Sequence, residues 1–518
     1  MLYPIRLEFL KMLRKIITSI TLIGASCTSQ WVFAQDNNSS DGRLYVFEPR
    51  VSINGTYSNN IDLSQRDQKS DLLTEISPGF RWSKNQGRIK GNVDYSLNQL
   101  LYAKNSNKNE LQNALNANGV AELIDNWAFI DVNGSISQQY ISAFGTPSFG
   151  NTNINDNKTE VSSFKFSPYV RGEFSDFASY EGRYTSSFIK NKSSAASDIS
   201  SNEGLFRLSS RELFNKLRWG IDVTKSIVDY DPGRRTTADV VRGNLQYPLG
   251  SQIVLTAIAG RESDNYITVN KDSRNFSGGG VMWTPAVTTK LSASTENHAY
   301  GRTHNLTFEH RTPRTGWYFS DNKNISKTPV DQGSTNLGSI YDLLFSQFIS
   351  IEPDPVKRAR LVNSFLSSNG IDPTTQILGG YSTAGLNMLR SQTLTFALLG
   401  VRDTITFSAV RTESQRLNEG TDAFGDFSNS QRINQNGITV GYSHKVSPVA
   451  VLNASITQQT SSNDTGLFAT KLRSFGLNYS TRLSNKITSN LGIRRTVSSG
   501  DTTSYEESAI TGGLNIRF

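Results

Sequence analysis

Apolar and polar residues alternate one by one, in runs of about ten residues, from residue 43 to the C-terminus. In the segment RIKGNVDYSLNQL, Ile89, Val93 and Tyr95 fall on one face, while Lys90 and Asn92 fall on the other. This two-residue period is that of a β-strand whose two faces meet different surroundings. The sequence therefore predicts an all-β chain of strands that are apolar on one side and polar on the other.

The connections between these runs alternate in length. Tight ones, such as PLGS at 248–251, take turns with long polar ones, such as TPSFGNTNINDNK and RLNEGTDAFGDFSNSQ. Strands joined in this way run up and down, with short turns at one end of the sheet and long loops at the other. The pattern indicates an antiparallel meander with two unequal ends.

A chain of polar composition can still span a membrane if its strands close into a barrel. Apolar residues make up only 36% of the chain, and after the first 40 residues no stretch approaches the roughly 20 apolar residues of a membrane-spanning helix. Within hydrocarbon every backbone group must be paired, so a membrane-spanning sheet must close on itself. We therefore expect a transmembrane antiparallel up-and-down β-barrel of about 22 strands, in a range of about 18 to 22, with an apolar exterior and a polar lumen.

The N-terminus has the order of a secretory signal peptide. Basic residues precede the apolar segment ITSITLIGAS, and a small-residue site ends at Ala34. We expect residues 1–34 to be removed and residues 35–518 to form the barrel, in the outer membrane of a Gram-negative bacterium. The sequence offers both Met1 and Met12 as candidate translation start sites.

The alternation gives way between about 339 and 370 to SIYDLLFSQFISIEPDPVKRARLVNSFLSSNGID. Asp354 before Pro355 is a favoured helix start, and Asn369 with Gly370 is a favoured helix end. We expect two short amphipathic helices inserted in a long outer loop. They would form either a lid packed on the rim or a constriction folded into the lumen.

The last strand ends on an aromatic residue. Leu514, Ile516 and Phe518 alternate with polar residues up to the C-terminus. Outer-membrane barrel proteins resemble one another in this ending, which the barrel-assembly machinery recognises. These three residues are the expected assembly signal, and that machinery and outer-membrane lipid are expected partners.

The histidines offer the only constellation that suggests an enzyme. His298 and His304 could face one another across a turn, with Glu296 nearby, as a metal site or as a base and its orienting group. Against this, His304 is in phase with Leu306 and Phe308 on the expected lipid face. We therefore expect no enzyme activity, no metal and no cofactor.

The distribution of charged residues gives no indication of nucleic-acid binding. The net charge of +8 is spread over many short segments, without a basic block interleaved with aromatic residues. Cations in the polar rows are candidate contacts for an acidic sugar, although each also suits simple hydration of the lumen; they are Lys90, Lys165, Arg171, Arg183, Arg242 and Arg494.

Four stretches carry a resemblance to a known family. They are LLTEISPGFRWSKNQGRIKGNVDYSLNQLLYA, LNANGVAELIDNWAFIDVNGSISQQYISAFG, IYDLLFSQFISIEPDPVKRARLVNSFLSSNGIDP and RDTITFSAVRTESQRL. In these the chain resembles the outer-membrane proteins associated with PEP-CTERM/exosortase exopolysaccharide systems of Gram-negative bacteria. The resemblance implies a porin-like conduit or accessory in exopolysaccharide export, with the polymer and other secretion components as partners. A general diffusion porin or solute-uptake channel, and a non-conducting structural or adhesive barrel, remain alternatives.

Overall fold

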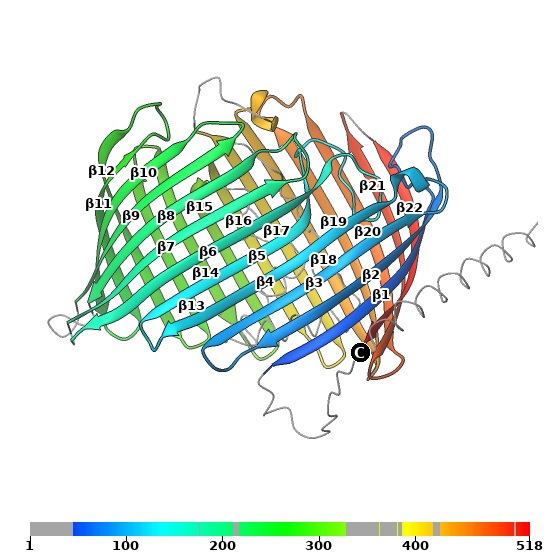
Figure 1. Ribbon diagram of the computed structural model, residues 1–518, viewed down its shortest axis with the longest axis horizontal. Coiled ribbons are helices and arrows are strands. Elements are labelled where there is room, and N and C mark those ends of the chain that lie inside the picture. Colours follow the sequence, from blue (N-terminus) through cyan, green and yellow to red (C-terminus); the bar gives the residue numbers. More distant parts are fainter. Residues whose placement is uncertain are drawn as a thin grey trace, which may run out of the picture. The chain divides into compact units, whose positions relative to one another are not determined.

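The computed structural model describes residues 45–175, 177–210, 217–327, 362, 381, 386–417, 425–501 and 504–518. These residues form a 22-stranded sheet in which each strand pairs with the next along the chain. The first strand, β1 (Val46–Ser58), also pairs antiparallel with the last, β22 (Tyr505–Arg517), so the sheet closes into a barrel (Figure 1). The prediction of an antiparallel up-and-down barrel of about 22 strands is confirmed.

The remaining strands follow in chain order. They are β2 (Asp71–Lys84), β3 (Ile89–Tyr102), β4 (Glu110–Ile124), β5 (Ala128–Tyr140), β6 (Lys158–Phe174), β7 (Ala178–Asn191), β8 (Asp198–Ser210), β9 (Arg218–Asp231), β10 (Thr236–Leu249), β11 (Ile253–Asp264), β12 (Asp272–Ala286), β13 (Thr289–His298), β14 (Gly301–Arg311), β15 (Thr315–Ser326), β16 (Asn387–Leu399), β17 (Asp403–Arg416), β18 (Arg432–Ser447), β19 (Ala450–Asn463), β20 (Ala469–Arg482) and β21 (Ile487–Gly500). Two short 3₁₀ helices, η1 (Ser106–Lys108) and η3 (Gly425–Ser428), lie in connections. No helix among the described residues is long and apolar enough to cross a membrane.

The two ends of the barrel differ as the sequence predicts. Connections such as 125–127, 250–252 and 448–449 are tight, and Asn126 (φ 55°) and Gly250 (φ 72°) take the left-handed conformation that such turns require. Connections such as 59–70, 141–157 and 417–431 are long. The C-terminus lies at the end with the short turns (Figure 1).

The strand register separates an apolar outer face from a polar inner face. On the outer face Phe164 lies opposite Phe188, and both side chains are about half exposed. On the inner face Lys165 lies between Asn133 and Ser187 of the neighbouring strands. A closed barrel with an apolar exterior, short turns at one end and long loops at the other has the form of bacterial outer-membrane proteins.

Buried apolar residues form separate clusters, mostly near the long-loop ends of the strands. In one of these clusters Ile61, from connection 59–70, packs with Leu73, Leu100 and Tyr102 of β2 and β3. The barrel therefore has several small cores where loops fold against inward-facing strand ends, rather than one central core.

Three predictions fall on residues that lie wholly or mainly outside the described ones. The signal peptide at 1–34 lies outside them entirely, as does the rest of the unit Met1–Leu44. Of the predicted helical insertion at 339–370, only Val362 is described, and its side chain is fully buried. The start site likewise stays a prediction.

Candidate functional site: the lumen wall and its outer mouth

Hydroxyl and amide side chains make up much of the inner face of the wall. Thr56 and Thr511 lie with their Oγ1 atoms 3.0 Å apart across the β1–β22 closure, and Ser167 and Thr185 have a matching 3.0 Å contact between β6 and β7. A hydroxyl group both donates and accepts hydrogen bonds. Thr56 and Ser167 are buried, whereas Thr511 and Thr185 are partly exposed and present neutral donors and acceptors to the lumen.

Three of the predicted lumen cations are paired with carboxylates. Arg183 on β7 donates to Asp131 (2.6 Å) and to Glu181 (2.8 Å). Arg242 on β10 donates to Glu296 (2.9 Å), and its other nitrogen lies 3.7 Å from Asp222. Local carboxylates therefore neutralise these two arginines. Neither acts as a free positive charge toward the lumen.

Arg494 on β21 is the third paired cation, and it lies beneath a loop. Its Nη2 contacts both carboxylate oxygens of Glu507 on β22 at 3.1 Å. The side chain of Glu507 is only 1% exposed and also accepts from Ser58 (2.8 Å) and from Asn153 of connection 141–157 (2.7 Å). The predicted sugar contact Arg494 is thus a fixed part of the wall-to-loop junction.

Arg171 and Arg183 take part in a stack on the inner face of β5 to β7. The rings of Phe129 and Tyr169 lie parallel with centroids 5.0 Å apart. The guanidinium of Arg171 covers Phe129 at 4.4 Å, and that of Arg183 covers Tyr169 at 3.8 Å. Both outer ring faces are occupied by cations, so the stack orders the arginines instead of offering a free aromatic platform.

The last predicted contacts are exposed. Lys90 near the short-turn end of β3, Lys165 on β6 and Arg171 on β6 are all solvent-exposed. Within the described part of the chain they form no ion pair. These three residues are the sequence-predicted contacts that remain open to a ligand.

Connection 141–157 folds back against the barrel wall. Tyr505 of β22 donates from its hydroxyl to the carbonyl of Pro147 (2.6 Å). The Tyr140 hydroxyl donates to the carbonyl of Ser148 (2.6 Å), and the Ser148 N–H donates back to that hydroxyl (3.0 Å). The ammonium of Lys158 contacts the carbonyl of Gly150. These bonds link β5 and β6 to β22.

A second contact joins this connection to the one between β17 and β18. Asp426 of η3 accepts from the Ser142 hydroxyl (2.5 Å) and from the Ala143 N–H (2.6 Å). Burial raises the pKa of Asp426 despite these two donors. We call this contact, made by Asp426, Ser142 and Ala143, the latch.

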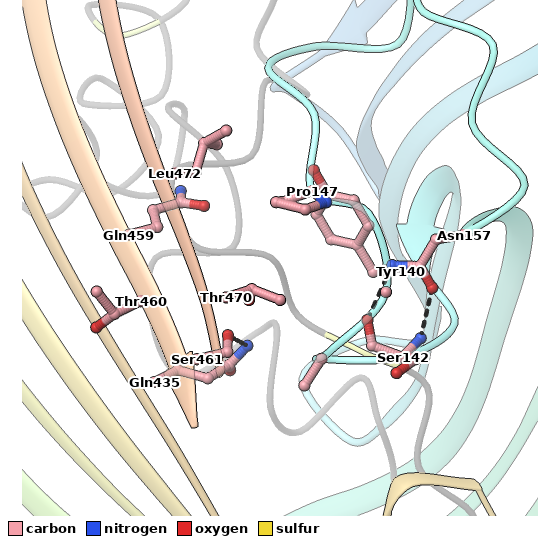
Figure 2. Close-up of a pocket in the computed structure, with 12 residues that line it drawn as sticks. Tyr140, Ser142, Pro147, Asn157, Gln435, Gln459, Thr460, Ser461, Thr470 and Leu472 are labelled. Atoms are coloured by element: carbon pink, nitrogen blue, oxygen red, sulfur yellow. Dashed lines mark hydrogen bonds between the residues drawn. The ribbon is translucent and has the colours of Figure 1, made fainter. Parts of the chain in front are cut away.

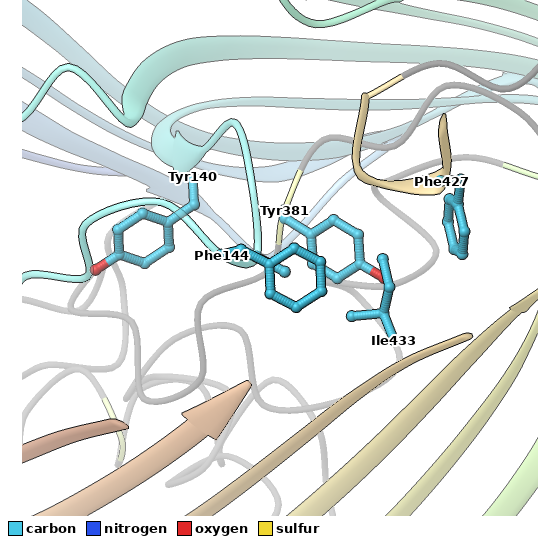
Figure 3. Close-up of a cluster of buried hydrophobic side chains, with 6 residues drawn as sticks. Tyr140, Phe144, Tyr381, Phe427 and Ile433 are labelled. Atoms are coloured by element: carbon cyan, nitrogen blue, oxygen red, sulfur yellow. The ribbon is translucent and has the colours of Figure 1, made fainter. Parts of the chain in front are cut away.

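An apolar cluster, drawn in Figure 3, includes Phe144 and Phe427, which adjoin the latch residues Ala143 and Asp426 in the sequence. Tyr140 and Phe144 come from the first connection and its strand, Phe427 from the second, and Ile433 from β18, with Tyr381 between them. All are less than 10% exposed. The cluster adds apolar burial to the latch, so the two connections are held together by both kinds of contact.

A polar pocket lies between connection 141–157 and the opposite wall (Figure 2). None of its described lining residues is charged, and Gln435 donates to Ser461 (3.2 Å) while Asn157 donates to the Ser142 carbonyl (3.0 Å). Gln459 and Thr470 complete its polar lining. These groups suit a neutral polar ligand that both donates and accepts hydrogen bonds.

The two histidines that could have formed a catalytic or metal site lie on opposite faces of the wall. His298 is inward, stacked between Phe276 and Tyr300, with Nδ1 2.7 Å from Glu262. His304 is on the lipid face, as its phase with Leu306 predicts. No group of three or more potential metal ligands occurs among the described residues.

The predicted assembly residues lie at the β1–β22 closure. Leu514 lies opposite Ile53, and Ile516 opposite Val51, on the outer face. The Phe518 N–H donates to the Pro49 carbonyl (3.0 Å), and its side chain is 65% exposed. Their recognition by the assembly machinery stays a prediction.

Sequence reasoning missed the acidic partners of the arginines and the latch. Asp131 and Glu507 lie on the inner face in the same alternation as the arginines, so the period alone could have found them. Asp426 lies in a connection, where no periodic signal exists.

No protein-family model matches the sequence, and the comparison with curated proteins found no match. Among solved structures, the siderophore receptor PirA from Pseudomonas aeruginosa is 9% identical with a TM-score of 0.46, and the match covers 91% of this chain and 80% of that one. The FrpB iron transporter from Neisseria meningitidis is 10% identical with a TM-score of 0.46, covering 91% and 82%. BauA, the ferric preacinetobactin receptor from Acinetobacter baumannii, is 11% identical with a TM-score of 0.47, covering 92% and 80%. The receptor and transporter descriptions apply to the matched proteins.

Proposed function

We propose that the protein is an outer-membrane, porin-like conduit or accessory that takes part in exopolysaccharide export. The observation that supports this most is the chemistry of the inner wall and the pocket, where neutral hydroxyl and amide groups predominate and the arginines are largely neutralised. A carbohydrate chain presents hydroxyl groups that match such a surface, and weak, repeated hydrogen bonds allow it to move along the wall.

The exposed cations add a preference for acidic sugars. Lys90, Lys165 and Arg171 reach solvent on the inner face of β3 and β6, where a carboxylate- or sulfate-bearing sugar would meet them. Their charges are screened by the solvent of the lumen, so each contributes a weak attraction. Weak attraction favours transport of a polymer through the lumen, because tight binding would hold the polymer in place.

Passage of a polymer requires the outer mouth to open. The latch and the Glu507–Asn153 contact hold connection 141–157 across part of the mouth. The proposal therefore includes a closed state, held by these contacts, and an open state in which they are broken.

Planar-bilayer recording of the purified barrel tests the proposal. The expected result is a conductance that the exopolysaccharide of the host strain blocks, with weaker block after the exchange K90Q/K165Q/R171Q and unchanged block after Arg261→Gln on the outer wall. Conductance that is indifferent to the polymer would instead indicate a general diffusion porin or solute-uptake channel.

Deletion of the gene provides the test in cells. Polymer trapped in the periplasm of the deletion strain would support export. A bilayer that stays sealed under all conditions, together with normal polymer secretion, would contradict the proposal and favour a structural or adhesive barrel.

A further inference from the structure

Basic side chains gather on the outer surface of β14 to β17. In the strand register His304 lies opposite Lys323, and Lys323 lies opposite Arg390. Arg411 lies opposite Gln392, two positions along β16 from Arg390. Together with Arg302, which shares the outer face of β14, these side chains form what we call the outer-wall patch: Arg302, His304, Lys323, Arg390 and Arg411.

The patch lies directly above an apolar band. The same faces of the same strands carry Phe308 opposite Phe319, and Phe319 opposite Leu394, nearer the short-turn end. Trp317 and Phe396 pack below them, with ring centroids 4.3 Å apart and the two rings tilted by 45°. The patch therefore lies on the long-loop side of the hydrocarbon-facing surface, at the level of the outer headgroups.

One buried carboxylate organises the patch. Asp321 is 7% exposed and accepts from Arg390 Nε (2.9 Å) and from the Gln392 amide (2.9 Å). His304 Nε2 lies 3.0 Å from the same carboxylate. Because one edge of the Arg390 guanidinium is fixed on Asp321 and its side chain is 40% exposed, the remaining donors face outward.

Cations outnumber carboxylates in the patch. Glu413 lies opposite Arg390 but pairs with Arg432 at 3.3 Å. Lys323 and Arg411 form no ion pair with any described residue. Positive charge is therefore left uncompensated on a surface that faces sideways into the membrane.

Elsewhere at this level, outward cations without an ion pair among the described residues also occur on β20, as Lys471 and Arg473, but no buried carboxylate fixes them. The corresponding outward residues of β1 to β3, such as Tyr57, Leu72 and Gln99, carry no charge. On β9 and β10, Lys225 is matched by Asp239 at 3.8 Å. The outer-wall patch is therefore distinguished by its spread over four adjacent strands and by the buried Asp321 that organises it.

We propose that the outer-wall patch binds the phosphate groups of an anionic lipid of the outer leaflet, whose acyl chains lie on the apolar band below. Guanidinium groups form paired hydrogen bonds with phosphate, and an ammonium group adds a point charge. A lipid satisfies both the cations and the continuous apolar surface beneath them. A free phosphate ion would satisfy the cations alone.

Native mass spectrometry of the full-length barrel in detergent, with diphosphoryl lipid A as the probe, tests this. The variant K323Q/R411Q removes the partly exposed Lys323 and the exposed Arg411 and leaves the Asp321 contacts intact. At about fivefold per basic side chain, it should weaken binding about 25-fold. The control Arg261→Gln removes an exposed outward cation of β11 that has no ion pair among the described residues, and it should bind as the unchanged protein does.

Two further arms identify the ligand. Lipid A without phosphates should bind the unchanged barrel at least as weakly as diphosphoryl lipid A binds K323Q/R411Q, because Arg302 and Arg390 remain in that variant. Millimolar inorganic phosphate should not displace the lipid. Equal binding by K323Q/R411Q and the unchanged barrel, equal loss in Arg261→Gln, or displacement by inorganic phosphate would each overturn the proposal. Unchanged heat-modifiable migration on gels confirms that the variants are folded.

Discussion

Two arginine–carboxylate pairs on the inner wall have the same chemistry and different surroundings. Arg183 and Asp131 are each about a quarter exposed and face the lumen from β7 and β5. Arg494 and Glu507 are 16% and 1% exposed and lie under connection 141–157. An ion pair in the open lumen is screened by water, whereas the pair under the loop depends on its partners for solvation. The difference shows that loop coverage, and not the strand pattern, decides what an inner-wall charge does.

Removing the carboxylate under the loop should have the largest effect. Glu507→Gln leaves Arg494 without a counter-charge in a buried site, which should lower the free energy of unfolding by about 3 kcal/mol. Denaturant unfolding of the barrel in lipid vesicles, followed by tryptophan fluorescence, measures it. The neighbouring Glu506→Gln, whose pair with Arg495 is 60% exposed on both sides, is the control. Equal effects in the two variants would contradict the role of burial.

Removing the latch should uncouple the loops without unfolding the barrel. Asp426→Ala leaves the Ser142 hydroxyl and the Ala143 N–H without their acceptor, at a cost of about 1–3 kcal/mol to the closed state. The open fraction in planar bilayers should rise by about tenfold, since about 1.4 kcal/mol corresponds to that factor. Asp464→Ala, in the exposed connection between β19 and β20, should leave the open fraction unchanged. If the closed state is populated equally in Asp426→Ala and in the unchanged protein, the latch does not hold the mouth closed.

The latch should also respond to pH. Burial raises the pKa of Asp426 above its ordinary value of 3.8, so the closed state binds a proton more tightly than the open state does. Closure is then most favourable at low pH and weakens as pH rises through the raised pKa. Conductance should therefore increase as pH rises above the ordinary carboxyl pKa of about 4. Asp426→Asn, which has no such titration, should flatten this dependence, and an identical profile in that variant would exclude Asp426 as its source.

Removing the carboxylate in the open lumen should have the smallest effect. Asp131→Asn leaves Arg183 paired with Glu181 at 2.8 Å and stacked on Tyr169. The unfolding free energy should fall by about 1 kcal/mol or less, in the same vesicle assay. A loss as large as that of Glu507→Gln would mean that the two pairs are equivalent and would remove the distinction between the covered and open parts of the wall.

The sequence alone determined the two-sided strands, the closure and the inner or outer position of most side chains. A strand exposes successive residues to opposite faces, so Lys165 and Phe166 had to separate once the period was recognised. His304 could be placed on the lipid face by the same rule. Alternation depends only on local backbone geometry, so the face on which a strand residue lies can be predicted without knowing its distant contacts.

Only the tertiary structure decided which charges meet and which are covered. The latch joins Ser142 to Asp426, and Asn153 reaches Glu507, across hundreds of intervening residues. No local period constrains a loop, so its contacts follow from the closure of the barrel and from the space inside it. Burial then fixes the energetics, because the cost of a charge depends on the water around it, and that is a property of the assembled wall.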